Sequence, residues 1–119
     1  MKTIALPLLA VFATAALAAS SNDDGKARDF SHELKPGGIA EECLRLEAGK
    51  SRTFEWKADS PMDFNIHYHD GDKVSYPVKA NKQYEGKGRF TASAGRDYCW
   101  MWSTKFPPAR LTGRLGAEE

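Results

Sequence analysis

The alternation of apolar and polar residues at a period of two is the feature that most constrains the fold of this chain. It starts at Glu42 and continues almost to the C-terminus, and no stretch after residue 18 sustains the 3.6-residue period of an amphipathic helix. The clearest run spans residues 63–69, where Phe64, Ile66 and Tyr68 share one face of an extended chain. Short runs of this kind, separated by turn residues, predict an all-β fold: an antiparallel β-sandwich of jelly-roll-like build.

The strand pattern divides into short segments. Strands are expected at residues 42–47, 53–56, 63–69, 74–78, 89–93, 97–103 and 110–115. Asp59-Ser60-Pro61 predicts a break, Asp70-Gly71 a tight hairpin turn, and residues 81–87 a polar loop. Pro77 predicts an edge strand or a bulge, because proline cannot donate a hydrogen bond to a neighbouring strand. The strand at residues 97–103 is apolar on both faces, which predicts a central strand covered on both sides.

The first 18 residues have the order of a secretory signal peptide. Lys2 provides a positive start, residues 4–17 form an uncharged apolar run, and small residues at 16–18 predict cleavage after Ala18. A transmembrane anchor is the alternative, but this run is shorter than the ~20 apolar residues that a spanning helix needs. We therefore expect an exported protein, periplasmic or extracellular, with no membrane span.

The rest of the chain divides into two parts. Residues 19–41 are mostly polar and offer few side chains for packing, which predicts a flexible N-terminal arm. Residues 42–116 hold the alternating pattern and are expected to form the single β-sandwich domain.

The charge balance limits the class of partner. Without Lys2, the 17 basic residues become 16, which equals the 16 acidic residues. A nucleic acid or an anionic membrane surface favours a basic excess, so neither is expected as the partner. No basic run exceeds two residues, and a basic patch can therefore arise only through folding.

The chain contains two cysteines, Cys43 and Cys99. Two thiols in an exported protein usually form a disulfide, and closing so long a loop would contribute about 4 kcal/mol in the chain-entropy model. The alternative is a catalytic or metal-binding thiol, but the pair lacks the C-x-x-C spacing of a redox site.

One cluster could bind a metal ion. His67 and His69 lie two residues apart on an expected strand, so they share one face with Cα atoms about 6.5–7 Å apart. Both imidazoles could reach one Zn²⁺ or Cu²⁺, with Asp63 or Asp70 as a third ligand and Met101 as a soft ligand for Cu(I). Spacing does not fix a third ligand, so we expect an ordinary polar strand face that contacts solvent, with the metal site as the alternative.

Tyr98, Trp100 and Trp102 form an aromatic stripe on one face of the most apolar strand. The stripe is expected to lie in the core, and the alternative is a surface that stacks a sugar or another flat ligand. No G-x-S-x-G, H-E-x-x-H or phosphate-binding glycine loop occurs, and we expect no enzyme activity.

Three segments resemble the motifs of the GOLD-domain family. Residues 46–56 resemble its opening glycine turn and aromatic strand, residues 63–66 its next motif, and residues 95–104 its late Gly-x-x-Tyr motif. The resemblance covers residues 43–115 and implies a GOLD-like β-sandwich. In the cargo receptors of this family, a cysteine before the first strand pairs with one in the late motif. The resemblance therefore implies the same pairing for Cys43 and Cys99.

The chain also departs from those receptors. Cys99 directly follows Tyr98, about two residues earlier than in the receptors, and Thr104 stands where they often have Asn. A receptor that links lumen and cytosol needs a transmembrane helix and a cytosolic tail, and neither is expected here. The resemblance thus implies the fold and a tendency to bind partners, but no trafficking role.

The sequence therefore predicts an exported, non-catalytic β-sandwich that binds a protein or a small ligand and needs no cofactor. The alternative is a periplasmic metal-binding protein that uses the face of His67 and His69 to hold copper or zinc.

Overall fold

The computed structural model describes residues 24–105 and 107–119, and every regular element among them is a β-strand. The strands are β1 (Arg28–Leu34), β2 (Ile39–Leu46), β3 (Ser51–Asp70), β4 (Lys73–Thr91), β5 (Arg96–Ser103) and β6 (Ala109–Leu115). All pairings between them are antiparallel. The expected signal peptide, residues 1–18, lies outside the described residues. Within the described ranges, no helix is long and apolar enough to cross a membrane.

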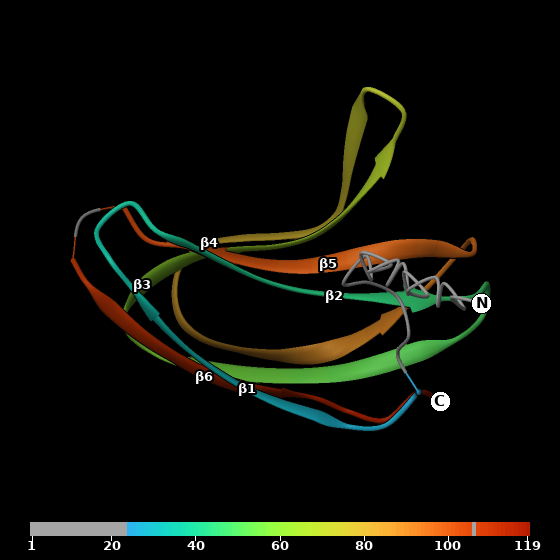
Figure 1. Cartoon of the computed structure of the whole chain (residues 1–119), viewed down its shortest axis with the longest axis horizontal. Helices are drawn as coiled ribbons and strands as arrows, with labels where there is room; N and C mark the ends of the chain where they lie inside the picture. Colours follow the sequence, from blue (N-terminus) through green and yellow to red (C-terminus); the bar gives the residue numbers. More distant parts are fainter. Residues whose placement is uncertain (1–23, 106) are drawn as a thin grey trace, which may run out of the picture.

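The strands form two layers that share the long hairpin of β3 and β4. The strand order is β1-β6-β3-β5-β2, and β4 pairs with β3 along its other edge. The first part of β3 pairs with β6 through Phe54–Ala58, and its second part pairs with β5 through Asp63–His67. Figure 1 shows β3 running through the layer of β1 and β6, then bending into the layer of β5 and β2. The predicted antiparallel β-sandwich is confirmed.

Two expected interruptions turn out to be bends within strands. The break at residues 59–61 is wrong, because β3 continues through it with a register shift between Lys57 and Met62. The loop at residues 81–87 is also wrong, because those residues belong to β4, where Lys82 has a φ of 56°. Strands that pass from one layer to the other turn the corner through such irregularities, so turn residues do not always end a strand.

The flexible arm expected at residues 19–41 is wrong from Arg28 onward. Residues 28–34 form β1, which pairs with β6 along its whole length, and β2 begins at Ile39. Phe30 and Leu34 are 8% and 5% exposed, and the ring centre of Phe30 lies 4.8 Å from that of Trp102. The strand joins the sandwich because β6 supplies its hydrogen bonds and the opposite layer covers its two apolar side chains.

The core lies between the layers and is rich in aromatic rings. Tyr98, Trp100 and Trp102 are at most 1% exposed, which confirms the prediction that this stripe is a core face. Across the layers, Phe90 packs against Trp100 with ring centres 5.8 Å apart, and Trp56 against Trp102 at 6.3 Å. These T-shaped contacts add to the apolar area that the rings bury.

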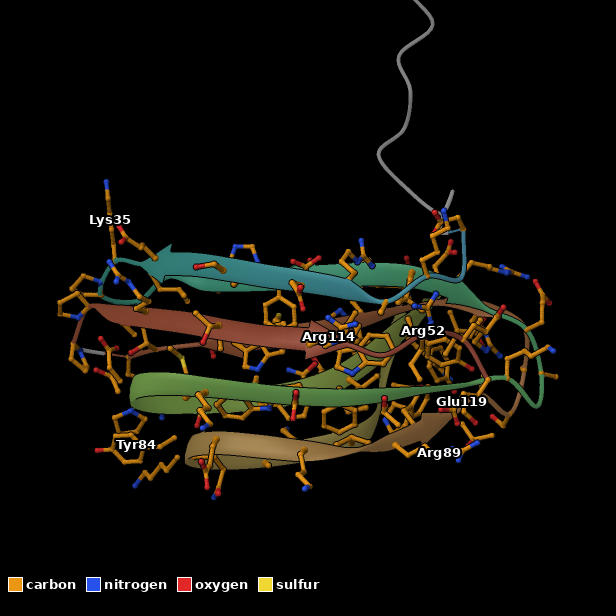
Figure 2. The ribbon with its side chains drawn as sticks, turned by 90° about the horizontal axis from the view of Figure 1, so that it is seen from below. Lys35, Arg52, Tyr84, Arg89, Arg114 and Glu119 are labelled. Carbon is orange, nitrogen blue, oxygen red and sulfur yellow. A yellow bond between two sulfur atoms is a disulfide. The ribbon has the colours of Figure 1, made fainter. Side chains whose placement is uncertain are left out.

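The ends of the described chain lie together. Glu118 donates a backbone hydrogen bond to the carbonyl of Gly25, and Glu119 exchanges two with Ser51. The Glu119 carboxylate also pairs with Arg89 of β4 at 3.0 Å, and Figure 2 shows these two residues close together at one end of the sandwich.

The hairpin turn predicted at Asp70-Gly71 is confirmed. Asp70 pairs with Lys73, which leaves Gly71 and Asp72 as a two-residue loop, and Gly71 has a φ of 60°. Figure 1 shows this tip projecting beyond the layer of β2 and β5. The hairpin therefore presents the end of β3 and the start of β4 away from the body of the sandwich.

Candidate functional site: the outer face of the β2–β5–β3 layer

Alternating residues in the second part of β3 point away from the core. Two of them belong to a polar cluster on the outer face of the sheet. Phe64 and Ile66 face inward, so Asn65 and His67 occupy the outer face. Around them lie Glu41 of β2, His69 of β3 and Tyr76 of β4. We call this cluster the His67 face; its members are Glu41, Asn65, His67, His69 and Tyr76.

His67 is buried although it lies outside the core. It is 4% exposed, and Asn65 is 8% exposed. The ring centre of His67 lies 5.3 Å from that of His69 and 5.8 Å from that of Tyr76. The side chains of neighbouring strands therefore cover this imidazole, and the expectation that this strand face contacts solvent is wrong at His67.

Hydrogen bonding orients the imidazole. Nδ1 of His67 lies 2.7 Å from Oδ1 of Asn65, an oxygen that can only accept, so Nδ1 carries the proton and donates. The other ring nitrogen, Nε2, lies 3.6 Å from Oε1 of Glu41. In the neutral ring, a nitrogen lone pair thus faces a carboxylate oxygen.

The surroundings also control the protonation of the ring. Burial lowers the pKa of His67 from its ordinary value of 6.5, the charge of His69 adds to this effect, and the Glu41 carboxylate opposes it. His67 is therefore neutral at pH 7, and the lone pair of Nε2 is available.

The structure brings only two of the four predicted metal ligands together. His67 and His69 are neighbours, as the spacing predicted. Asp63 instead accepts a hydrogen bond from the backbone amide of Lys82 at 3.1 Å, and Asp70 lies 3.9 Å from Arg96. The aspartates are thus separated from each other, and each has its own partner.

Met101 and Glu41 lie opposite each other on this face, where the register pairs them across β5 and β2. Met101 is half-buried and is also the cross-strand partner of Asn65. Sequence reasoning missed Glu41 because residues 19–41 were assigned to the arm. The alternation of Leu44 and Leu46, extended backward through Ala40, would have placed Glu41 on the outer face.

The predicted disulfide between Cys43 and Cys99 is confirmed, and it lies beside the His67 face. The two residues are directly paired across β2 and β5, and Cys99 is in turn paired with His67. The Glu41 carboxylate lies near both sulfurs: among the described residues, these three groups place their ligand-type atoms within 4.8 Å of one another. The sulfurs are bonded to each other, so only the Glu41 carboxylate remains as a ligand from that group.

A second surface feature is the outer edge of β4. Within residues 24–105 and 107–119, β4 pairs only with β3, so its other edge carries no strand. It bears three exposed apolar or aromatic side chains, Val74, Tyr76 and Tyr84, which are 38%, 46% and 57% exposed. Figure 2 shows Tyr84 at the margin of the sheet, pointing outward.

A groove lies beside residues 85–87 of β4, between that strand and its neighbours. It has a volume of about 480 Å³, and its lining includes Trp56, Gly86 and Gly113. The indole Nε1 of Trp56 has no hydrogen-bond partner among the described residues. A side chain at Gly86 would collide with this indole, so glycine lets the indole, which is 2% exposed, pack against the backbone of β4.

The fold places the chain in the class of small antiparallel β-sandwiches. No protein-family model and no curated protein matches this sequence. Among solved structures, the periplasmic inhibitor of g-type lysozyme from Aeromonas hydrophila is similar, with a TM-score of 0.59 and 12% identity over 81% of this chain and 89% of that one.

Two further solved structures share the fold. The pre-peptidase C-terminal domain of a collagenase from Bacillus anthracis has a TM-score of 0.57 and 13% identity, over 80% of this chain and 90% of that one. A mitogen from Yersinia pseudotuberculosis has a TM-score of 0.55 and 9% identity, over 78% of this chain and 86% of that one. At such identities the likeness shows the fold alone. The relationship to GOLD domains stays a prediction, since none of the three is named as one.

Proposed function

We propose that this chain is an exported, non-catalytic β-sandwich that binds an acidic protein through β4. The observation that carries the proposal is the composition of β4, an edge strand with exposed tyrosines and lysines. Export is supported by the apolar run at residues 4–17 and by the disulfide. The order of the three motifs supports a GOLD-like relationship as part of the same proposal.

The exposed aromatic residues support a protein partner. Tyr76 and Tyr84 present large, rigid surfaces that end in a hydroxyl group, the combination that is enriched in protein interfaces. Val74 adds an exposed apolar side chain near the hairpin tip. A partner that covers these side chains would remove their apolar area from water.

The charge of β4 supports an acidic partner. The strand carries four exposed lysines and one glutamate: Lys73, Lys79, Lys82, Lys87 and Glu85. These lysines give β4 an excess of positive charge, although the predicted mature chain is balanced as a whole. Complementary charge accelerates encounter and selects the partner more than it raises affinity.

The backbone of β4 favours contact through side chains over addition of another strand. Pro77 has no backbone N–H, and Lys82 adopts a left-handed conformation, so both interrupt a regular edge. Lysine, proline and local irregularities are the usual means by which edge strands avoid pairing with foreign strands.

The structural comparison supports the class of function but not the partner. One protein of this fold is named as an inhibitor of g-type lysozyme, so the fold is compatible with binding a protein. For this reason, g-type lysozyme is the first defined probe, with inhibition and direct binding as readouts.

Site-specific photocrosslinking in the source cell tests the proposal more generally. A photoreactive amino acid would replace Tyr76 or Tyr84, and the matched control would carry it at Ser31, which is exposed on β1, away from β4. We expect protein adducts at both tyrosine positions and not at Ser31, followed by salt-sensitive binding of the purified partner. Binding should weaken when Lys82 and Lys87 are changed to Glu.

Three outcomes would overturn the proposal. These are adducts with lipid or nucleic acid alone, equal labelling at Ser31, and partner binding that is insensitive to both the lysine changes and salt. A small-molecule function would instead be supported by a ligand in the groove over Trp56, whose volume suits a compact ligand.

A further inference from the structure

We infer that the His67 face binds a divalent transition-metal ion, Zn²⁺ or Cu²⁺, through Nε2 of His67, the carboxylate of Glu41 and the imidazole of His69. The His67 face shares Tyr76 with the proposed protein interface, but the inference is separate from that proposal, because the three ligands lie on β2 and β3 and none is a residue of β4.

The contact between His67 and Glu41 is the first observation. Nε2 and Oε1 lie 3.6 Å apart, and both are acceptors when the ring is neutral. Two ligand atoms that share a tetrahedral metal with bonds of about 2.0–2.1 Å lie about 3.3 Å apart. A cation between the two atoms would therefore require a shift of only a few tenths of an ångström and would replace an unfavourable contact with two bonds.

The orientation of the imidazole is the second observation. Asn65 accepts the proton of Nδ1 at 2.7 Å, which leaves Nε2 as the free lone pair and directs it toward Glu41. Ligand histidines in metal sites usually donate their second ring N–H to an oxygen, which sets both the tautomer and the ring orientation. Asn65 is itself buried, so it holds this arrangement before any ion binds.

The distance between the two imidazoles is the third observation. Their ring centres lie 5.3 Å apart. Two imidazoles bound to one tetrahedral ion through bonds of about 2.0–2.1 Å have ring centres about 5 Å apart. The ring nitrogens of His69 are not within 4.8 Å of both of the other ligand atoms in this structure. The side chain is exposed, however, and can turn about its bonds to reach the ion.

The ligand set determines the kind of ion. Two imidazoles and one carboxylate suit Zn²⁺ or Cu²⁺, whereas Mg²⁺ and Ca²⁺ prefer oxygen ligands alone. The charge of Glu41 partly neutralises the ion. The nearby Lys79 ammonium lies over the ring of Tyr76, 5.0 Å from its centre.

Titration calorimetry of the oxidised full chain with ZnCl₂ or CuSO₄ tests the inference. We expect one site, and the variants Glu41→Gln and His69→Gln should each weaken binding by about tenfold or more. His67→Gln should have the largest effect. Because His67 is buried, near-ultraviolet circular dichroism would establish that this variant still folds, and the two exposed ligands test the site even if it does not.

The chain offers matched controls. His32 and Glu42 form a second pair, with Nε2 and Oε1 3.0 Å apart, and Asp70 is one of the two aspartates that the sequence offered as a third ligand. The variants His32→Gln, Asp70→Asn and Tyr84→Ala should leave metal affinity unchanged. Histidine NMR signals should respond to zinc at His67 and His69 before His32.

The inference is overturned if neither ion binds more tightly than about 1 mM, a free energy of roughly −4 kcal/mol. It is also overturned if Glu41→Gln and His69→Gln bind as the unaltered chain does, or if His32→Gln or Asp70→Asn abolishes binding. Loss of partner binding in a Tyr84→Ala variant that still binds metal would separate the two proposals.

Discussion

The two faces of the second part of β3 are both buried, but by different means. On the inner face, Phe64 and Ile66 are covered by apolar side chains, including rings from the opposite layer, and they are 4% and 0% exposed. On the outer face, Asn65 and His67 are 8% and 4% exposed, although no layer of the described strands covers them. The ring of Tyr76, on the hairpin that Figure 1 shows projecting, lies 5.8 Å from that of His67, and Asn65 is the cross-strand partner of Met101.

The difference shows that burial alone does not define a core. The inner face gains free energy from apolar area removed from water. The outer face instead desolvates an imidazole, and this desolvation is unfavourable unless hydrogen bonds compensate. Asn65 supplies one such bond, while the contact of Nε2 with Glu41 leaves the cluster without a second. The inner face should therefore dominate stability, and the outer face should respond to pH and to ligands.

The largest expected effect is on the inner face. Trp100→Ala should lower the free energy of unfolding by about 3–5 kcal/mol, because it removes a fully buried ring and leaves a cavity. Urea unfolding followed by far-ultraviolet circular dichroism would measure it. Met101→Ala, one residue later on the outer face, is the matched control and should lower it by roughly 1 kcal/mol. Equal losses at the two positions would contradict the contrast between the faces.

The second effect concerns the disulfide that joins β2 and β5 on the outer face. Changing both Cys43 and Cys99 to Ser should lower the free energy of unfolding by about 2–4 kcal/mol, because the unfolded chain regains the entropy of a long closed loop. Thermal unfolding with and without a reducing agent would measure it. The reducing agent should shift the midpoint of the unaltered chain and leave that of the double variant in place. A shift in both would point to another cause.

The features that local sequence predicted are those fixed by neighbours along the chain. The alternation at Tyr98, Trp100 and Trp102 predicted a core face, and Asp70-Gly71 predicted a hairpin turn; both are confirmed. The pairing of Cys43 and Cys99 followed from their being the two cysteines present. The core face and the turn depend on residue type and short-range spacing, whereas the pairing depends on the cysteine count and the expected export.

The features that local sequence did not predict depend on distant parts of the chain. β1 contains two buried apolar residues, Phe30 and Leu34, which is too few for a local signal, and β6 provides its hydrogen bonds from the other end of the chain. The bend near Pro61 was interpreted as a break because Asp, Ser and Pro occur both at bends within a strand and at turns between strands. Glu41 was lost with the arm, so the third member of the candidate metal site could be found only from the pairing of β2 with β5 and of β5 with β3.

The third effect is a dependence of stability on pH that originates in the outer face. Burial lowers the pKa of folded His67 below its ordinary value of 6.5, so the unfolded chain binds the proton more strongly. This contribution to stability is complete above about pH 6.5 and is lost as the pH falls through the folded pKa. Urea unfolding at pH 7 and pH 5 should therefore show a smaller difference for His67→Gln than for the unaltered chain.

Glu41→Gln sharpens this test. The carboxylate opposes the lowering of the His67 pKa, so its removal should move the titration of the His67 ring signals to lower pH. A shift to higher pH, or a His67→Gln variant with the same pH dependence as the unaltered chain, would show that the outer imidazole does not control acid stability.

The smallest expected effect on stability is at the edge of the sandwich, where an aromatic ring has no cover. Tyr84 is 57% exposed, so Tyr84→Ala should change the free energy of unfolding by no more than about 0.5 kcal/mol. The same loss of an aromatic ring would thus be nearly silent in urea unfolding, in contrast to Trp100→Ala. If Tyr84 contacts the partner proposed for β4, this variant should weaken that binding while the fold remains intact. A loss of stability comparable to that of Trp100→Ala would instead make Tyr84 a structural residue and would remove it from the proposed interface.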